Sequence, residues 1–173
     1  MSCRIVESAP TGETFIFDDE WNEADGRVRR IEYKLAPNKG VPLHFHPRTA
    51  QSFEVVSGCL HVKVNRREQV LNAGARLSTG PGDRHTQWNA DNAPVHAIEG
   101  YDPPIDIEPF FTVMPYALGS KNPLKIAVFF SDFRRVSAAG SLNLRIFITI
   151  FGPVGRLLGL ARWYRDLLPR QKV

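Results

Sequence analysis

Cysteine is scarce in this chain, which has two among its 173 residues, Cys3 and Cys59. Two cysteines so far apart provide neither a disulfide framework nor the spacing of a zinc finger. Free thiols are typical of a reducing compartment, and the opening residues, MSCRIVESAPTGETF, lack the apolar run of a signal peptide. We therefore expect a cytoplasmic protein.

Long apolar runs and several functional motifs are missing as well. The run IFITIFGPVG has ten residues between Arg145 and Arg156, whereas a membrane-spanning helix needs roughly 17 to 25. No aromatic-basic stripe or helix-turn-helix pattern indicates nucleic-acid binding. No nucleophile elbow, phosphate-binding glycine loop or Cys–His pair of recognisable spacing is present. The net charge of +4 could suit an anionic ligand or surface, but a solvated surface with a few additional arginines is the favoured interpretation.

Strand-like alternation of apolar and polar residues dominates the first part of the chain. Ile31, Tyr33 and Leu35 alternate with charged residues, which predicts a half-buried strand. About nine such short segments, separated by turn residues, predict an all-β barrel or sandwich. Residues 1–12 are expected to be a loose arm, and residues 21–26 a polar turn. Small barrels enclose a cavity that holds one small ligand.

The alternation ends after Pro104. Segments 109–120, 123–136 and 144–166 have helix-like apolar spacing, the last interrupted at residues 152–155. We therefore divide the chain into a β-barrel domain, residues 1–107, and a helical extension, residues 108–173. The favoured interpretation packs the extension on the barrel or on a dimer partner. Contact of the C-terminal helices with a membrane surface, or a lid over the barrel mouth, are the alternatives.

Three histidines form the main candidate site. His44 and His46 are two residues apart in a predicted strand, so both side chains project from one face, about 6 to 7 Å apart at the backbone. That spacing allows both to bind one metal ion. His85 follows a Gly-Pro-Gly turn, and Gln51 is expected to face the interior because it shares parity with Phe53. Imidazoles converging on one point suit Zn, Fe, Ni or Cu.

Two segments carry these residues, GVPLHFHPRTAQSFEVVSG (residues 40–58) and GARLSTGPGDRHTQWN (residues 74–89). Together they resemble the paired motifs of the cupin superfamily. The resemblance implies a double-stranded β-helix (jelly roll) barrel, a small-molecule ligand and a homodimer. The chain departs from the family pattern at Gln51, which replaces a metal-binding glutamate, and at Gly80, which replaces a proline. Gly40 also lies two residues closer to the histidines than usual.

The substitution at position 51 leaves two functional hypotheses. A glutamine offers only a neutral amide oxygen, so metal affinity should fall and a bound ion would keep its full 2+ charge. The first hypothesis is a mononuclear metal site formed by His44, His46 and His85, with Gln51 in or near the shell. It would act on a small organic molecule by oxygenation, isomerisation or hydrolysis. The alternative is a non-catalytic, metal-free barrel that binds or senses a small molecule.

The substrate would be bound by aromatic residues near these positions. Phe53 and Trp88 flank the predicted ligands, and Tyr33 lies in the predicted strand at residues 27–35. All three are predicted to contribute to an apolar pocket, although aromatic residues at such spacing are commonly part of a core. Whether the protein is an enzyme is left open by the sequence.

Overall fold

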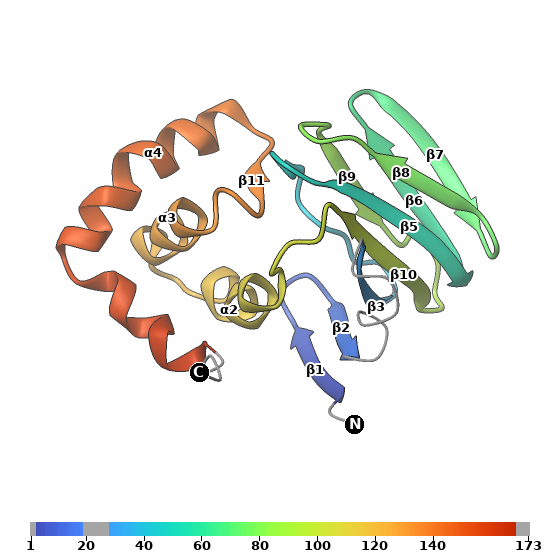
Figure 1. The fold of residues 1–173 in the computed structure, drawn as a ribbon, viewed down its shortest axis with the longest axis horizontal. Helices are drawn as coiled ribbons and strands as arrows, with labels where there is room; N and C mark the ends of the chain where they lie inside the picture. Colours follow the sequence, from blue (N-terminus) through green and yellow to red (C-terminus); the bar gives the residue numbers. More distant parts are fainter. Residues whose placement is uncertain (1–2, 19–27, 169–173) are drawn as a thin grey trace.

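Two facing β-sheets form a barrel-like sandwich, and the C-terminal helices lie at one of its ends (Figure 1). The computed structural model describes residues 3–18 and 28–168. The predicted all-β barrel with a C-terminal helical extension is confirmed. The expected turn at residues 21–26 lies outside the described residues.

The first sheet has six strands in the order β1-β2-β3-β10-β5-β8, and the second has five in the order β11-β4-β9-β6-β7. Their bounds are β1 Cys3–Ser8, β2 Glu13–Asp18, β3 Arg29–Leu35, β4 His44–Phe45, β5 Ala50–Ser57, β6 Cys59–Val64, β7 Arg67–Asn72, β8 Arg76–Thr79, β9 His85–Trp88, β10 Val95–Asp102 and β11 Ala138–Ala139. Inward residues alternate with outward ones, as in β3, where Ile31, Tyr33 and Leu35 are buried. The core therefore lies between the two sheets.

The expectation of a loose N-terminal arm is wrong for Cys3–Ser8. This segment is β1, and it pairs with β2 along its whole length, from Cys3 opposite Asp18 to Ser8 opposite Glu13. Most of its side chains are exposed, so the sequence shows no clear alternation of apolar residues. Its backbone hydrogen bonds to β2, rather than a buried face, explain the strand.

The extension contains α2 Glu108–Leu118, α3 Pro123–Asp132, α4 Leu142–Leu157 and the 3₁₀ segment η1 Leu160–Leu167. Phe111 of α2 stacks on Phe15 of the barrel, with ring centroids 3.7 Å apart. Between α3 and α4 the chain returns to the barrel, where β11 pairs with β4. The extension therefore contributes a strand as well as helices.

The predicted interruption at residues 152–155 is wrong, because α4 continues through it. The chain instead turns at Gly159, which has a φ of 75°. Gly152 and Gly155 face α3, and a β-carbon on them would lie 2.6 Å from Ser131 Cβ and 2.5 Å from Val128 Cγ2, respectively. These glycines therefore allow the two helices to approach closely, and they do not end the helix.

Candidate metal centre and its cavity

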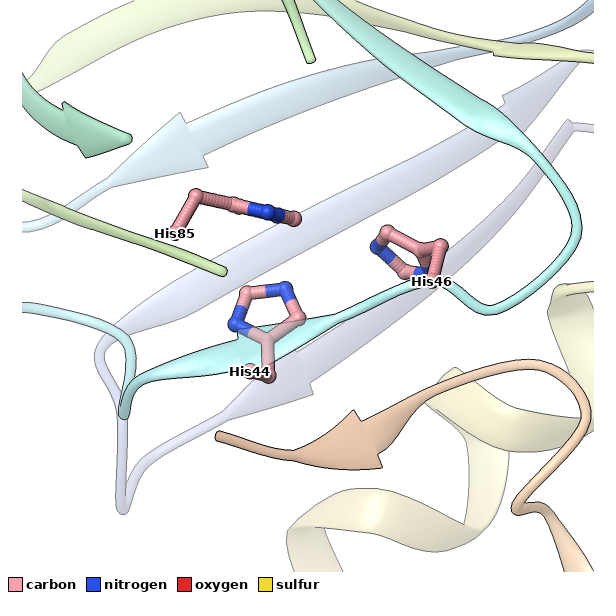
Figure 2. Close-up of side chains that lie close together, drawn as sticks. All are labelled: His44, His46 and His85. Carbon is pink, nitrogen blue, oxygen red and sulfur yellow. The ribbon is translucent and has the colours of Figure 1, made fainter. Parts of the chain in front are cut away.

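The three histidines come together at the mouth of the barrel (Figure 2). His44 is the first residue of β4, His46 follows that short strand, and His85 begins β9. His44 and His85 are direct partners in the β4–β9 pairing. One ring nitrogen from each histidine lies within 4.8 Å of the other two. Two nitrogens that share an ion at about 2.0 to 2.1 Å from each are at most about 4.2 Å apart, so the rings would move slightly inward around a bound metal.

Backbone carbonyls fix the orientation of all three rings. The Nδ1 atoms lie 2.8 Å from the Pro42 carbonyl for His44, 2.7 Å from the Val136 carbonyl for His46 and 2.9 Å from the Asp83 carbonyl for His85. A carbonyl oxygen can only accept, so each Nδ1 carries the proton and donates it. In a neutral ring this leaves a lone pair on Nε2, the arrangement that metal-binding histidines adopt.

Burial keeps the rings neutral. It is the largest cause lowering the pKa of each: well below the ordinary value for His44, below it for His46, and to about 4 for His85. The neighbouring imidazoles lower the pKa of His44 and His85 further. At neutral pH the site therefore presents three unprotonated ring nitrogens.

Gln51 completes this group, and its side chain is buried. Its Oε1 lies 3.0 Å from His46 Nε2 and 2.7 Å from His85 Nε2. An oxygen that faces two nitrogen lone pairs at these distances repels them unless a cation lies between. The opposite amide orientation would turn its NH₂ group toward the rings and suits the metal-free protein.

The amide group of Gln51 connects the rings to a buried carboxyl. Gln51 Nε2 donates to the Tyr101 hydroxyl at 3.1 Å, and that hydroxyl donates to Glu99 Oε2 at 2.7 Å. Tyr101 and Glu99 are both buried on β10. Burial raises the pKa of Glu99 to about 8, so this carboxyl favours its neutral form more than an exposed one does. A cation at the histidines would favour the ionised form.

The donor set therefore fits a divalent transition metal. It consists of three neutral imidazoles and one amide oxygen, with the ring orientations fixed by the backbone. Imidazole donors suit Zn, Fe, Ni and Cu, and the residues do not distinguish among these ions.

A cavity of about 70 Å³ lies between the barrel mouth and the helices. His44, His46 and Tyr101 border it from the barrel, and Phe110, Phe111 and Met114 of α2 close it from the other side. A cavity needs roughly 10 to 15 Å³ to hold one water molecule. This cavity therefore has room for a small organic molecule of a few non-hydrogen atoms.

Glu13 is the one acidic residue among those that border this cavity. Its side chain comes from β2 and is 3% exposed, and its Oε2 has no hydrogen-bond partner within the described part of the chain. Burial raises the pKa of Glu13 from 4.5 to about 7, although the nearby hydroxyls of Thr11 and Tyr33 lower it in part. A buried carboxyl of this kind can both accept and donate a proton near neutral pH.

The three aromatic residues predicted to bind substrate do not border this cavity. Phe53 is buried in the core, with its ring centroid 6.4 Å from that of His85. Tyr33 is also a core residue. The expectation that Trp88 flanks the ligand positions is wrong: it lies three residues from His85 in β9, so it projects from the opposite face and stacks on His61.

Sequence reasoning missed Glu13, Tyr101 and the carbonyl of Val136. Strand parity could have found the first two, since Glu13 alternates with the buried Phe15 and Tyr101 with the buried Ala97. No local pattern could have found Val136, which lies 90 residues from the ring that it contacts.

Comparisons with known proteins agree with this fold. Residues 31–101 match the family described as Cupin domain. An oxidoreductase from Arthrobotrys oligospora is 34% identical over 80 residues, which cover 46% of this chain. This chain spans only 30% of that relative's length.

Two solved structures share the fold at low sequence identity. KdgF from Halomonas sp. has a TM-score of 0.51 and 17% identity, over 61% of this chain and 91% of its own. A sugar phosphate isomerase from a cupin superfamily, from Silicibacter pomeroyi, has a TM-score of 0.50 and 17% identity, over 59% of this chain and 71% of its own. The domain match and the shared double-sheet fold together show that residues 31–101 of this chain form a cupin domain with the double-stranded β-helix fold.

Proposed function

We propose that this cupin is a metal-dependent enzyme that acts on a small, largely apolar organic molecule in the cavity between the barrel mouth and α2. One observation carries the proposal. All three histidines direct Nδ1 to a backbone carbonyl, so in each neutral ring Nε2 carries the lone pair that a shared ion requires. The Gln51 amide contacts His46 and His85 but not His44, so a structural hydrogen bond alone does not account for the convergence of all three rings.

Isomerisation by proton transfer is the reaction that the cavity supports best. A divalent metal held by His44, His46, His85 and Gln51 would supply a Lewis acid that polarises a substrate oxygen. Glu13, on the wall of the same cavity, would take a proton from the substrate and return it at another atom. Its raised pKa suits both steps near neutral pH.

The cavity walls favour this chemistry over hydrolysis. Phe110, Phe111 and Met114 cover the side facing the helices, and an apolar wall limits the access of bulk water. The substrate would thus be held by apolar contacts and oriented by one oxygen-containing group. A carbonyl compound with an acidic adjacent C–H is the class that fits.

Oxidation is the second candidate, and the similarity to an oxidoreductase from Arthrobotrys oligospora favours it. Imidazole-rich sites also suit iron and copper, which are redox-active ions. The two candidates differ in which metal supports turnover. Isomerisation should proceed with zinc or nickel in the absence of oxygen, whereas oxidation requires a redox-active ion and an electron acceptor such as oxygen.

Metal analysis tests the proposal most directly. Protein purified without an affinity tag should contain, or take up after dialysis against Zn, Fe, Ni or Cu, about one equivalent of metal per chain. Less than about a tenth of an equivalent, with no uptake on reconstitution, would contradict it. That result would support the metal-free ligand-binding barrel, in which the Gln51 amide hydrogen-bonds the histidines directly.

A further inference from the structure

The outward face of α4 is unusually apolar. The residues of this helix that are buried are Ile148, Gly152 and Gly155, which pack toward α3. The large apolar residues exposed along α4 and just after it are Leu142, Leu144, Ile146, Ile150, Phe151, Val154, Leu157 and Leu158. Most soluble proteins expose no such continuous apolar surface unless it meets a partner.

The large apolar residues of α4 lie on its outward face rather than on the face that packs against the protein. At about 100° per residue, Ile146, Ile150 and Leu157 lie opposite the face that packs on α3. Leu157 is 89% exposed and Ile150 55%. A surface helix of a soluble protein normally turns polar residues to that side. The polar residues Arg145, Thr149 and Arg156 lie on one flank of the apolar face, and Asn143 in the first turn is the one polar residue of α4 on that face.

Positive charge is concentrated in the same C-terminal part of the chain that contains α4. Residues 119–173 contain ten Lys and Arg and only two Asp and Glu. Residues 1–118 contain twelve Lys and Arg and sixteen Asp and Glu. Arg162 and Arg165 of η1 are exposed beyond the end of α4. A shallow hollow of about 220 Å³ on α4 joins Arg145 to Ile146 and Ile150. The apolar face therefore belongs to the basic part of the molecule.

We propose that α4 and η1 bind the surface of a membrane that contains anionic lipids, with α4 lying in the plane of the interface. Its apolar residues would enter the acyl region while arginines contact the headgroups. Among the described residues no helix could cross a membrane alone; α4 and η1 would suffice only as a pair, and they meet at an angle of 86°. Because α3 covers one side of α4, a surface position fits better than a spanning one (Figure 1).

The charge distribution also argues against a second copy of the chain as the occupant. A symmetric contact through α4 would bring two basic segments together, because residues 119–168 contain eight Lys and Arg against two Asp and Glu. Like charges at such an interface oppose association. An anionic lipid surface is attracted by the same residues.

Vesicle sedimentation tests this proposal with the full chain. Vesicles of 7:3 phosphatidylcholine and phosphatidylglycerol should bind the protein, vesicles of phosphatidylcholine alone should bind it at least about tenfold more weakly, and added salt should weaken the first interaction. The double variant Ile150→Ser/Leu157→Ser should lose at least about tenfold in affinity, because it removes two large side chains from the face. The matched control is Val56→Ser/Val70→Ser, which changes two exposed apolar residues on the barrel and should bind as the unchanged protein does.

The arginines have their own test. Arg162→Gln/Arg165→Gln should weaken binding to the anionic vesicles by about fivefold per residue, with little effect on phosphatidylcholine vesicles. Equal binding to both vesicles, or no binding to either, would overturn the proposal. A dimer in lipid-free solution that Ile150→Ser/Leu157→Ser converts to monomer would also overturn it and assign the face to a second copy. These results do not depend on whether the histidines hold a metal.

Discussion

The barrel mouth and the outer face of α4 depart from the usual distribution of residues in opposite ways. At the mouth, polar side chains such as Gln51 and His85 are buried, whereas on α4 large apolar residues such as Leu157 are exposed. Buried polar groups and extended exposed apolar surfaces are the informative exceptions in a folded protein. Neither arrangement is explained by stability of the isolated chain, so both regions are the places to look for function.

The two regions are joined by the segment between α3 and α4. The Val136 carbonyl accepts a hydrogen bond from His46, and β11 pairs with β4 so that Ala139 lies opposite His44. The same segment leads directly into α4. The helical extension therefore helps to position the histidines, and it is not merely attached to a complete barrel.

Loss of one imidazole should have the largest effect on the buried region. His85→Ala removes one of three ring donors from a site that has no carboxylate ligand to compensate. Outer-sphere partners alone are worth 10- to 100-fold in metal affinity, so we expect Co²⁺ binding to weaken by about a thousandfold. A Co²⁺ absorption titration in competition with a chelator measures it.

His96→Ala is the matched control for this change. His96 lies on β10, and its Nε2 is 2.9 Å from Glu32 Oε1. It is not one of the three histidines that come together at the candidate centre. It should bind Co²⁺ as the unchanged protein does. Equal binding by His85→Ala would mean that the three histidines are not the metal site.

Glu13 should make stability depend on pH in a way that an exposed carboxyl does not. Its pKa is raised from 4.5 to about 7 in the folded protein, so the folded state binds more protons than the unfolded state between those values. The contribution of Glu13 to the free energy of unfolding is therefore fully present below pH 4.5, and it is lost as the pH rises through 7. A shift of this size corresponds to roughly 3 kcal/mol.

Glu13→Gln removes this dependence. The free energy of unfolding of the variant, minus that of the unchanged protein, should therefore be larger at pH 8 than at pH 4.5 by roughly 3 kcal/mol. Urea unfolding at the two pH values measures the difference. Glu68→Gln, at a largely exposed carboxyl, should show no such change, and a Glu13→Gln variant that behaves like it would mean that Glu13 titrates normally.

The sequence predicted the barrel and the convergence of His44, His46 and His85 because both depend on local rules. Strand alternation and the two motif spacings are visible within segments of fewer than 20 residues. The cavity depends instead on long-range contacts, such as Phe111 on Phe15, which no local pattern encodes. The prediction for Trp88 was wrong because it relied on the short distance in sequence from His85. Residues 85 and 88 of β9 are three apart, so their side chains project from opposite faces of the strand.

Restoring a carboxylate at position 51 should strengthen metal binding. Gln51→Glu adds a negative charge beside the histidines, and we expect Co²⁺ affinity to rise by about thirtyfold through charge attraction. The metal-free variant should be less stable, because the new carboxylate is buried. Gln87→Glu, a buried glutamine on β9, should lose stability without gaining affinity. If both variants bind Co²⁺ as the unchanged protein does, Gln51 is not next to the ion.

The contribution of the extension to the site can be tested at Gly140. A β-carbon there would lie 2.5 Å from Leu43 Cγ and 2.9 Å from the Leu43 carbonyl, so Gly140→Val should push β11 away from β4. We expect about tenfold weaker Co²⁺ binding, the scale of an outer-sphere change. Ser141→Val, at the exposed neighbouring position, should bind normally. An unchanged affinity in Gly140→Val would mean that the barrel positions the histidines without the extension.

The smallest expected effect is the contribution of the exposed apolar residues of α4 to the stability of the protein. Ile150→Ser/Leu157→Ser should change the free energy of unfolding by less than about 0.5 kcal/mol, because neither side chain is buried. Ile148→Ser, on the side of the same helix that packs on α3, should cost about 2 to 4 kcal/mol. Urea unfolding of lipid-free protein measures both. A large cost for the exposed pair would mean that the face is covered in solution, and the contrast with the barrel mouth would disappear. A negligible cost would mean that these apolar residues do not stabilise the isolated fold, as the proposed membrane contact requires.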